Sequence, residues 1–222
     1  IEREGVTHMT ATPAITGDLV AYSRRTGRKF PTLVQIGGGG AARAPEQVRA
    51  IAAVFEKAYP GTGWGMTETN AIGVGIAAGD YLRKPESSGR VSAVLEIRVA
   101  DENNRPLPAG QRGELQIRGA SIMRGYYDNP KANAAEFVDG DWFRTGDVAL
   151  IDEEGFVFIV DRIKDLVIRG GENIGCGAVE YALQEHPAVE EACVYGVPDA
   201  RLGEEVGCTL YVSRPASESE LR

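Results

Sequence analysis

The 222-residue chain is poor in the residues that build disulfide and metal sites. It has three cysteines, Cys176, Cys193 and Cys208, without a C-x-x-C spacing, and two histidines, His8 and His186. An odd number of widely spaced cysteines is a poor disulfide framework, and two histidines are too few for a histidine-based metal cluster. We therefore interpret the cysteines as buried reduced thiols in a cytoplasmic protein, and His186 as a capping residue near a helix end.

The chain also lacks long apolar runs and an excess of positive charge. No apolar run approaches the roughly 20 residues that span a bilayer, and no signal-peptide core follows the charged start Ile1-Glu2-Arg3-Glu4. The 32 acidic and 24 basic residues give a net charge of −8, which argues against nucleic acid as a partner. A phosphorylated ligand is still compatible, because local cations and helix N-termini can bind phosphate in an acidic protein.

The first part of the chain has the order strand, glycine turn, helix. The apolar run from Thr32 to Ile36 predicts a buried strand, and it leads into Gly37-Gly38-Gly39-Gly40, where only glycine lets a backbone turn tightly beside a ligand. Pro45 then begins a helix, which Tyr59-Pro60-Gly61 is expected to end. Its apolar stripe consists of Val48, Ile51, Ala52 and Phe55. This order is typical of an α/β domain with ligands at strand ends, although the glycines do not form G-x-G-x-x-G.

From about residue 88 the pattern indicates β structure. Apolar and polar residues alternate over 95–99 and 115–117, and 148–151 with 156–160 reads as a hairpin. We expect its acidic connection, residues 152–154, to be a solvated turn without a ligand. After Lys164, short strands at 166–168, 192–197 and 206–212 and a helix ending near Pro187 suit a small α+β domain.

Four motifs carry polar groups on glycine turns between apolar segments: 63–69 (GWGMTET), 142–147 (WFRTGD), 160–165 (VDRIKD) and 170–174 (GGENI). A carboxylate such as Asp147 suits ribose hydroxyls, and a cation such as Arg162 suits phosphate. A threonine hydroxyl can donate to a phosphate oxygen, a glutamate carboxylate is a hard ligand for Mg²⁺, and a tryptophan offers a face for a purine.

In this order, the four motifs resemble those of the adenylate-forming superfamily, which comprises acyl-CoA synthetases, peptide-synthetase adenylation domains and beetle luciferases. Residues 122–130 (IMRGYYDNP) and 170–174 look like the branch of fatty-acyl and aryl CoA ligases. The resemblance implies the C-terminal part of the large α/β domain over 1–87, a β-rich subdomain (small barrel) over 88–162, and most of a small α+β C-terminal domain over 163–222.

The resemblance also implies roles for single residues. Thr67 would contact the α-phosphate, Glu68 would hold Mg²⁺, Trp64 would pack on adenine, and Asp147 and Arg162 would bind ribose and phosphate. Lys164 would be the hinge about which the small domain rotates. A further set would line the nucleotide, acyl and CoA pockets: Gly39, Gly40, Ala41, Gly63, Gly65, Met66 and, for the pantetheine tunnel, Gly171. Cys176 is expected to be a packing residue.

By this resemblance the parent protein is an AMP-forming acid–thiol ligase that uses MgATP and CoA to activate a carboxylic acid, with a fatty acid favoured. Two alternatives stay open: a peptide-synthetase-type adenylation domain that loads a carrier protein, and a non-catalytic fragment. The family's phosphate loop and C-terminal lysine have no counterpart here, so we expect the chain alone to be inactive. A capping box, Ser217 to Glu220, predicts a helix start. Exposed apolar surface on such a fragment predicts self-association.

Overall fold

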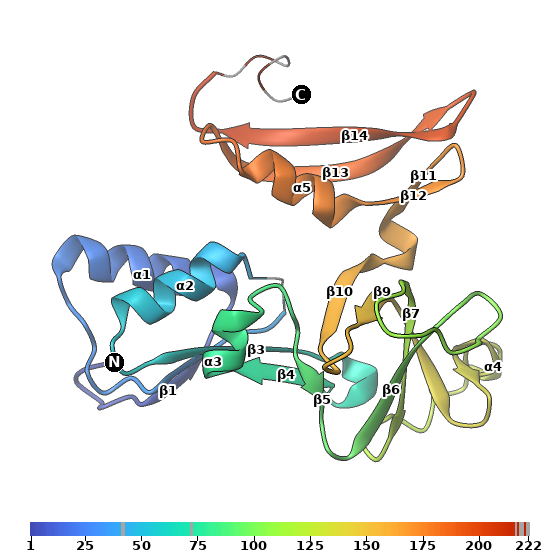
Figure 1. Cartoon of the computed structure of the whole chain (residues 1–222), viewed down its shortest axis with the longest axis horizontal. Helices are drawn as coiled ribbons and strands as arrows, with labels where there is room; N and C mark the ends of the chain where they lie inside the picture. Colours follow the sequence, from blue (N-terminus) through green and yellow to red (C-terminus); the bar gives the residue numbers. More distant parts are fainter. Residues whose placement is uncertain (41–42, 72, 216, 218–219, 221–222) are drawn as a thin grey trace.

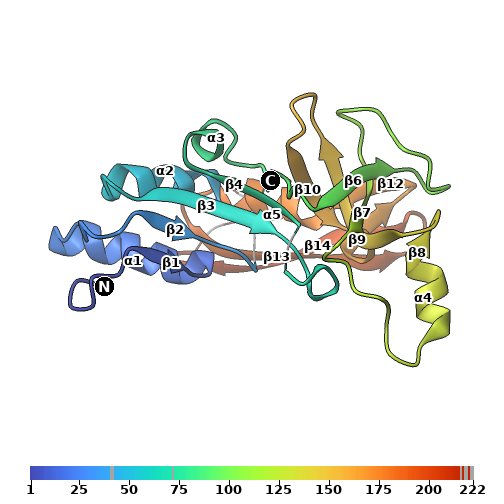
Figure 2. The same cartoon turned by 90° about the horizontal axis from the view of Figure 1, so that it is seen from below.

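A computed structural model describes residues 1–40, 43–71, 73–215, 217 and 220. These residues form three β-sheets that follow one another along the chain, each with its own helices (Figure 1). Seen from below, the helix α1 of the first part and the helix α4 of the second lie at opposite ends of the molecule (Figure 2). Across the described residues, no helix has the length and apolar character needed to cross a membrane.

The first sheet has the strand order β1-β2-β3-β4-β5. Strands β1 to β3 are parallel, and β4 and β5 continue the sheet in antiparallel pairing. Helices α1 and α2 both lie on one face of it (Figure 1). The strands are β1 (His8–Thr10), β2 (Gln35–Gly37), β3 (Tyr59–Trp64), β4 (Val74–Ala77) and β5 (Arg90–Val91), and the helices are α1 (Pro13–Thr26), α2 (Pro45–Val54) and α3 (Ala78–Arg83).

Helix α2 begins at the predicted proline and buries the predicted stripe, since Val48 and Ile51 are fully buried and Phe55 follows directly. The predicted end was wrong. The helix stops at Val54, and the segment 59–61 belongs to strand β3. Pro60 is tolerated there because the Tyr59 N–H already donates to the neighbouring strand at Val34 O (3.0 Å), while pairing on the other side begins only after the proline.

The second sheet is antiparallel in the order β10-β9-β7-β6, with β8 added beside β9. Its elements are β6 (Leu95–Ala100), β7 (Gly113–Gly119), α4 (Pro130–Glu136), β8 (Phe137–Val138), β9 (Trp142–Ile151) and β10 (Val157–Arg162). Of the alternating apolar positions, Leu95, Val99, Leu115 and Ile117 are buried and Ile97 is half-buried, while Gln116 between two of them is buried as well.

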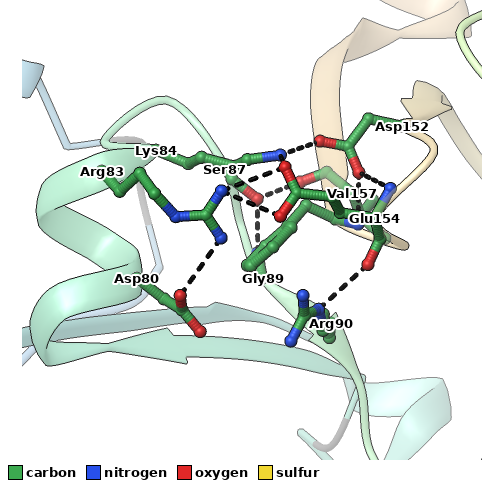
Figure 3. Close-up of polar contacts among 10 residues, drawn as sticks. Asp80, Arg83, Lys84, Ser87, Gly89, Arg90, Asp152, Glu154 and Val157 are labelled. Carbon is green, nitrogen blue, oxygen red and sulfur yellow. Dashed lines mark hydrogen bonds and ion pairs between the residues drawn. The ribbon is translucent and has the colours of Figure 1, made fainter.

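We expected the acidic turn between β9 and β10 to be simply solvated. Instead, its carboxylates form ion pairs with α3 and the residue that follows it. Lys84 at the end of α3 makes ion pairs with Asp152 and Glu154, and Arg83 pairs with the same Glu154 at 2.8 Å (Figure 3). The Lys84 ammonium also lies 4.5 Å from the ring centroid of Phe156. The turn therefore forms, together with Arg83 and Lys84, a contact between the second sheet and the first, which we call the joint between the sheets.

Backbone contacts strengthen the same joint (Figure 3). The Ser87 hydroxyl donates to Val157 O, and Val157 N–H donates to Gly89 O, both at 2.8 Å. Gly89 has φ +114, and a Cβ there would lie 2.0 Å from Gly75 O. Only glycine allows this close passage of two backbones.

The third sheet is antiparallel in the order β12-β11-β14-β13, with helix α5 packed against one face (Figure 1). A single 3-10 turn, η2 (Ile163–Asp165), connects β10 to it. The elements are β11 (Leu166–Arg169), β12 (Glu172–Gly175), α5 (Cys176–Gln184), β13 (Val189–Asp199) and β14 (Gly203–Val212). Val167, Cys176 and Val194 form its buried core.

The sequence placed all three thiols in the interior, and two of them are not there. Cys176 is buried, whereas Cys193 and Cys208 are exposed on the long β13–β14 hairpin, because one short helix cannot cover such a hairpin. His186 Nδ1 accepts a hydrogen bond from Ala188 N–H (3.2 Å) in the turn after α5, and this bond closes the turn rather than capping the carbonyls of the helix. In the predicted capping box, Ser217 N–H donates to Glu220 Oε2 at 2.7 Å.

Candidate active site

The glycine turn after β2 and the motif 63–69 at the end of β3 share one edge of the first sheet. Strands β2 and β3 are parallel with Ile36 opposite Pro60, so both strands release their chains at the same end. Gly39 and Gly40 come after β2, Gly63 and Trp64 end β3, and Gly65 follows β3. Among the described residues, no atom lies within 4 Å of the Cβ position of Gly39 or Gly40, so there is free space beside these two glycines, whereas the Arg43 side chain fills the corresponding space at Gly38. Ala41, the next predicted residue, lies outside the described residues.

The side chain of Asp147 joins this edge to the second sheet. Its Oδ2 accepts a hydrogen bond of 2.7 Å from the indole N–H of Trp64, 83 residues away in the sequence, and its Oδ1 lies 3.4 Å from Arg162 Nε. Arg162 stands directly opposite Asp147 in the β9–β10 ladder. Three of the predicted site residues, from three different strands, therefore form one cluster.

Burial sets the electrostatics of that cluster. Asp147 is 4% exposed, and its desolvation raises the pKa of the carboxyl above its ordinary value of 3.8. The hydrogen bond from Trp64 and the charge of Arg162 oppose this effect, because both stabilise the ionised carboxylate. An ionised carboxylate held between these donors is suited to accept hydrogen bonds from vicinal hydroxyls.

The local backbone places the Asp147 side chain by a bulge in β9. Gly146 has φ +72, which suits glycine, and the β7–β9 register shifts at this level. The Thr145 hydroxyl donates to Leu115 O (2.7 Å), and Asp147 N–H donates to the same hydroxyl oxygen (3.1 Å). Glu114, nearly buried, accepts from Gly146 N–H at 3.2 Å. The Thr-Gly-Asp order thus fixes both the bulge and the direction of the carboxylate.

The sequence suggested that the Trp64 ring stacks on adenine, whereas in the structure its indole N–H donates to Asp147. Its ring packs in the apolar core beside Val74 and Leu95, and its edge lies against Gly73, where a Cβ would come within 2.7 Å of the indole. Its N–H is engaged by Asp147. Contact with adenine remains a prediction, and the observed role is to orient the carboxylate.

The turn that carries Thr67 and Glu68 is a short 3-10 helix, η1 (Thr67–Thr69), directly after β3. The Thr69 hydroxyl closes the turn by accepting from Met66 N–H and donating to Met66 O, both at 3.0 Å. Thr67 is exposed at its start, and Glu68 is half-buried. Glu68 Oε1 accepts a hydrogen bond of 3.0 Å from the hydroxyl of Tyr126.

Tyr126 is a residue that the sequence argument quoted within a motif without assigning it to the site. Its burial, together with the adjacent Glu68 carboxylate, raises the pKa of Tyr126 to about 12. The phenol is hence protonated at neutral pH and remains a hydrogen-bond donor. Glu114 was missed as well, because nothing in its sequence neighbourhood distinguishes it from other strand glutamates.

The donor set is suited to Mg²⁺ bound together with phosphates. No cluster of three or more metal-ligating side chains occurs among the described residues. A single carboxylate such as Glu68 is nevertheless typical of Mg²⁺ sites, in which phosphates and water supply the remaining ligands. The chemistry of the residues present is therefore compatible with a metal–nucleotide complex rather than with a metal held by protein alone.

The remaining predicted residues lie toward the third sheet. Lys164 is exposed in η2, the connection between the second and third sheets. Gly171 forms the β11–β12 turn with φ +92, and a Cβ there would meet no atom within 4 Å, so backbone conformation is the visible reason for glycine. The Cys176 thiol donates to Asp165 O, and burial raises the pKa of the thiol, as expected for a packing residue.

Comparison with known proteins identifies the family. Residues 1–127 match the family described as AMP-binding enzyme, and residues 178–222 match the AMP-binding enzyme C-terminal domain. The chain belongs to the AMP-binding enzyme family. The match over residues 1–127 includes the glycine turn after β2, the motif 63–69 and Tyr126.

Named relatives of this family member are CoA ligases for different acids. A 4-hydroxybutyrate–CoA ligase of Metallosphaera sedula is 36% identical over 217 residues, which cover 93% of this chain and 39% of that protein. A long-chain-fatty-acid–CoA ligase of Thermus thermophilus is 37% identical over 208 residues, which cover 88% and 38%. The chain thus spans about 40% of the length of these relatives.

A solved structure of O-succinylbenzoate CoA synthetase from Bacillus subtilis, in complex with its acyl-adenylate intermediate, has the same fold. It superimposes with a TM-score of 0.88 at 31% identity and covers 100% of this chain and 44% of that one. The predicted fold class, part of an adenylate-forming enzyme with α/β and α+β portions, is confirmed by this likeness and by the mixed sheets of the chain.

Proposed function

We propose that the protein to which this chain belongs is an AMP-forming acid–thiol ligase. It would join a carboxylic acid to ATP, release pyrophosphate, and transfer the acyl group to the thiol of CoA. The observation that supports this proposal is the cluster of Trp64, Asp147 and Arg162, with the Glu68 turn following Trp64 in the chain. A carboxylate for ribose, a cation for phosphate and a carboxylate for Mg²⁺ are the groups that a nucleotide would need.

The residues would divide the work as follows. The Asp147 carboxylate binds the ribose hydroxyls and so fixes the sugar of the nucleotide, while Arg162 neutralises phosphate or completes the ribose contact. Thr67 donates to the α-phosphate, and the open glycine turn with Gly39 and Gly40 admits the acyl group and adenine. Mg²⁺ held at Glu68 would supply charge neutralisation for the phosphates.

Lys164 is proposed as the hinge of the small C-terminal domain. It is exposed in a single 3-10 turn between two sheets, where few backbone positions can absorb a rotation. Gly171 would then approach the CoA arm after rotation. This role corresponds to a division of the chain at 1–87, 88–162 and 163–222, with the hinge at the start of the last part.

For the acid, we propose a fatty acid as the first candidate. A long-chain-fatty-acid–CoA ligase is among the relatives, and the motif 122–130 resembles that branch. Relatives acting on 4-hydroxybutyrate and on O-succinylbenzoate define the alternatives to be tested. The chain by itself is expected to catalyse weakly or not at all, because a cation at the transferring phosphoryl group is a large catalytic contribution and no lysine of that role was recognised here.

The test is carboxylate-dependent ATP–pyrophosphate exchange by the complete protein, measured with fatty, aryl, short hydroxy and amino acids. Two hydrogen bonds to a charged acceptor are worth about 1.5–3 kcal/mol each, so Asp147→Ala should lower exchange at least about 100-fold. Asp18→Ala, on the exposed side of α1, is the matched control and should leave exchange unchanged. Folded protein that exchanges with no acid would refute the ligase proposal, and exchange with amino acids alone would favour carrier-protein loading.

A further inference from the structure

The segment 121–126, between β7 and α4, is bonded to the turn that carries Glu68. Met123 N–H donates to the main-chain oxygen of Glu68, and the Asn70 side-chain amide donates to Ser121 O, both at 2.8 Å. The hydroxyl of Tyr126 then reaches the Glu68 carboxylate itself at 3.0 Å. Two segments more than 50 residues apart are thus joined at three points around one side chain.

The backbone of Tyr126 is bonded to the side chain of Asn133 on α4. Its N–H donates to Asn133 Oδ1 at 2.6 Å, and the Asn133 side-chain amide donates back to Tyr126 O at 3.0 Å. The preceding Gly125 has φ +148, and a Cβ there would lie 2.9 Å from Asn133 Oδ1. The φ of +148 favours glycine at this position, because residues with a Cβ rarely adopt it. Asn133 therefore fixes the backbone of Tyr126, independently of the hydrogen bond from the Tyr126 hydroxyl to Glu68.

A glutamate that ligates a metal must be held in one rotamer, because its three rotatable bonds otherwise spread the carboxylate over several positions. In this chain the hydrogen bond occupies Oε1 and leaves Oε2 for another ligand. Outer partners of this kind orient the ligating group and tune its affinity for the metal. The neighbouring Tyr127 makes the contrast clear, since it is fully exposed (100%).

We propose that Tyr126 is a positioning residue that fixes the Glu68 carboxylate for Mg²⁺, held in place by Asn133 and Gly125. The inference rests on the proposed function, which makes Glu68 the metal ligand. It adds a residue from the loop between β7 and α4 to the proposed nucleotide site. Tyr126 acts only through Glu68 and touches no reacting atom.

The experiment compares Tyr126→Phe with Tyr127→Phe in the complete protein. Binding of ATP is measured by calorimetry over a range of Mg²⁺ concentrations, and binding of AMP is measured in EDTA. Loss of an outer partner typically weakens metal affinity by about 10-fold or more, so Tyr126→Phe should raise the Mg²⁺ requirement for ATP binding about 10-fold. AMP affinity, the melting temperature and all properties of Tyr127→Phe should match the unmodified protein.

A second arm uses Glu68→Gln, alone and combined with Tyr126→Phe. If Tyr126 acts through Glu68, adding Tyr126→Phe to Glu68→Gln changes the Mg²⁺ requirement no further. An unchanged Mg²⁺ requirement in Tyr126→Phe overturns the inference, and so does an equal loss of AMP affinity, which would indicate a structural role. If the unmodified protein binds neither ATP nor AMP, the proposed function itself fails, and that result is distinct from both.

Discussion

Arg43 is a buried cation that has no carboxylate partner among the described residues, and replacing it should stabilise the fold. The side chain is 5% exposed, between the β2 turn and α1, and it donates only to neutral oxygens, Thr16 Oγ1 at 3.4 Å and Gly37 O at 3.3 Å. Its Nε and Nη1 are buried without a hydrogen-bond partner, and no acidic group of the described residues forms an ion pair with it. Burial accordingly lowers the pKa of the guanidinium.

Methionine has a similar volume and removes the charge, so Arg43→Met is the informative change. The two acceptors keep other bonds, because the Thr16 hydroxyl still donates to Thr12 O (3.1 Å) and Gly37 O still accepts from Ala11 N–H (3.2 Å). No polar group is left unsatisfied by the substitution. Replacing buried charged groups by apolar residues of like volume typically gains up to about 1–4 kcal/mol. For a domain of this size, a gain of about 2 kcal/mol raises the melting temperature by about 4–8 °C.

The assay is urea and thermal unfolding of the purified chain. Arg49→Met is the matched control, since Arg49 lies on α2, shortly after Arg43 in the chain, with a 61% exposed side chain paired to Glu46 at 3.2 Å. The free energy of unfolding of that variant should change by less than about 0.5 kcal/mol. A lower urea midpoint or melting temperature for Arg43→Met would refute the reasoning and show that the guanidinium makes a net favourable contribution where it is.

Three further predictions test the site and the joint between the sheets. Asp147→Asn should stabilise the chain at pH 7. The pKa of Asp147 is raised in the folded protein, so its contribution to the free energy of unfolding is fully present below the ordinary pKa of 3.8 and is lost as pH rises through the folded pKa. The unfolding curves of the variant and the unmodified protein should therefore converge in acid. Lys84→Met should lower the melting temperature and reduce its dependence on salt, because the pairs with Asp152 and Glu154 are lost; an unaltered salt dependence would contradict the joint. Gly89→Ala should cost at least about 1–3 kcal/mol in urea unfolding, from φ +114 and the close backbone, whereas equal stability would show that the two backbones can separate.

The sequence was most informative where a pattern has one physical solution. Pro45 and the stripe behind it predicted α2, and alternating residues predicted β6 and β7, because periodicity reports which side is buried. The sequence predicted no element at α1, which begins at Pro13 and buries few residues, Thr16, Val20 and Ser23. Without a wide apolar stripe, such a helix has no strong periodic signal.

In the candidate site, too, some features were predictable from sequence and others were not. Asp147, Glu68 and Arg162 were named from their motifs, which place suitable chemical groups on glycine turns. Their partners were not predictable in the same way. The bond from Trp64 to Asp147 depends on how the second sheet packs beside the first, and the bond from Tyr126 to Glu68 depends on the path of a loop.

By itself, then, the sequence determined the family to which the chain belongs and several local elements, such as α2, and it proposed which residues could bind a nucleotide. Tertiary structure decided which groups meet. Asp147 acquires its burial and its raised pKa only when strands distant in the chain come together, and the acidic turn becomes a joint only opposite Lys84. The reason is that burial and hydrogen-bond partners are properties of packed surfaces, which local sequence patterns do not encode.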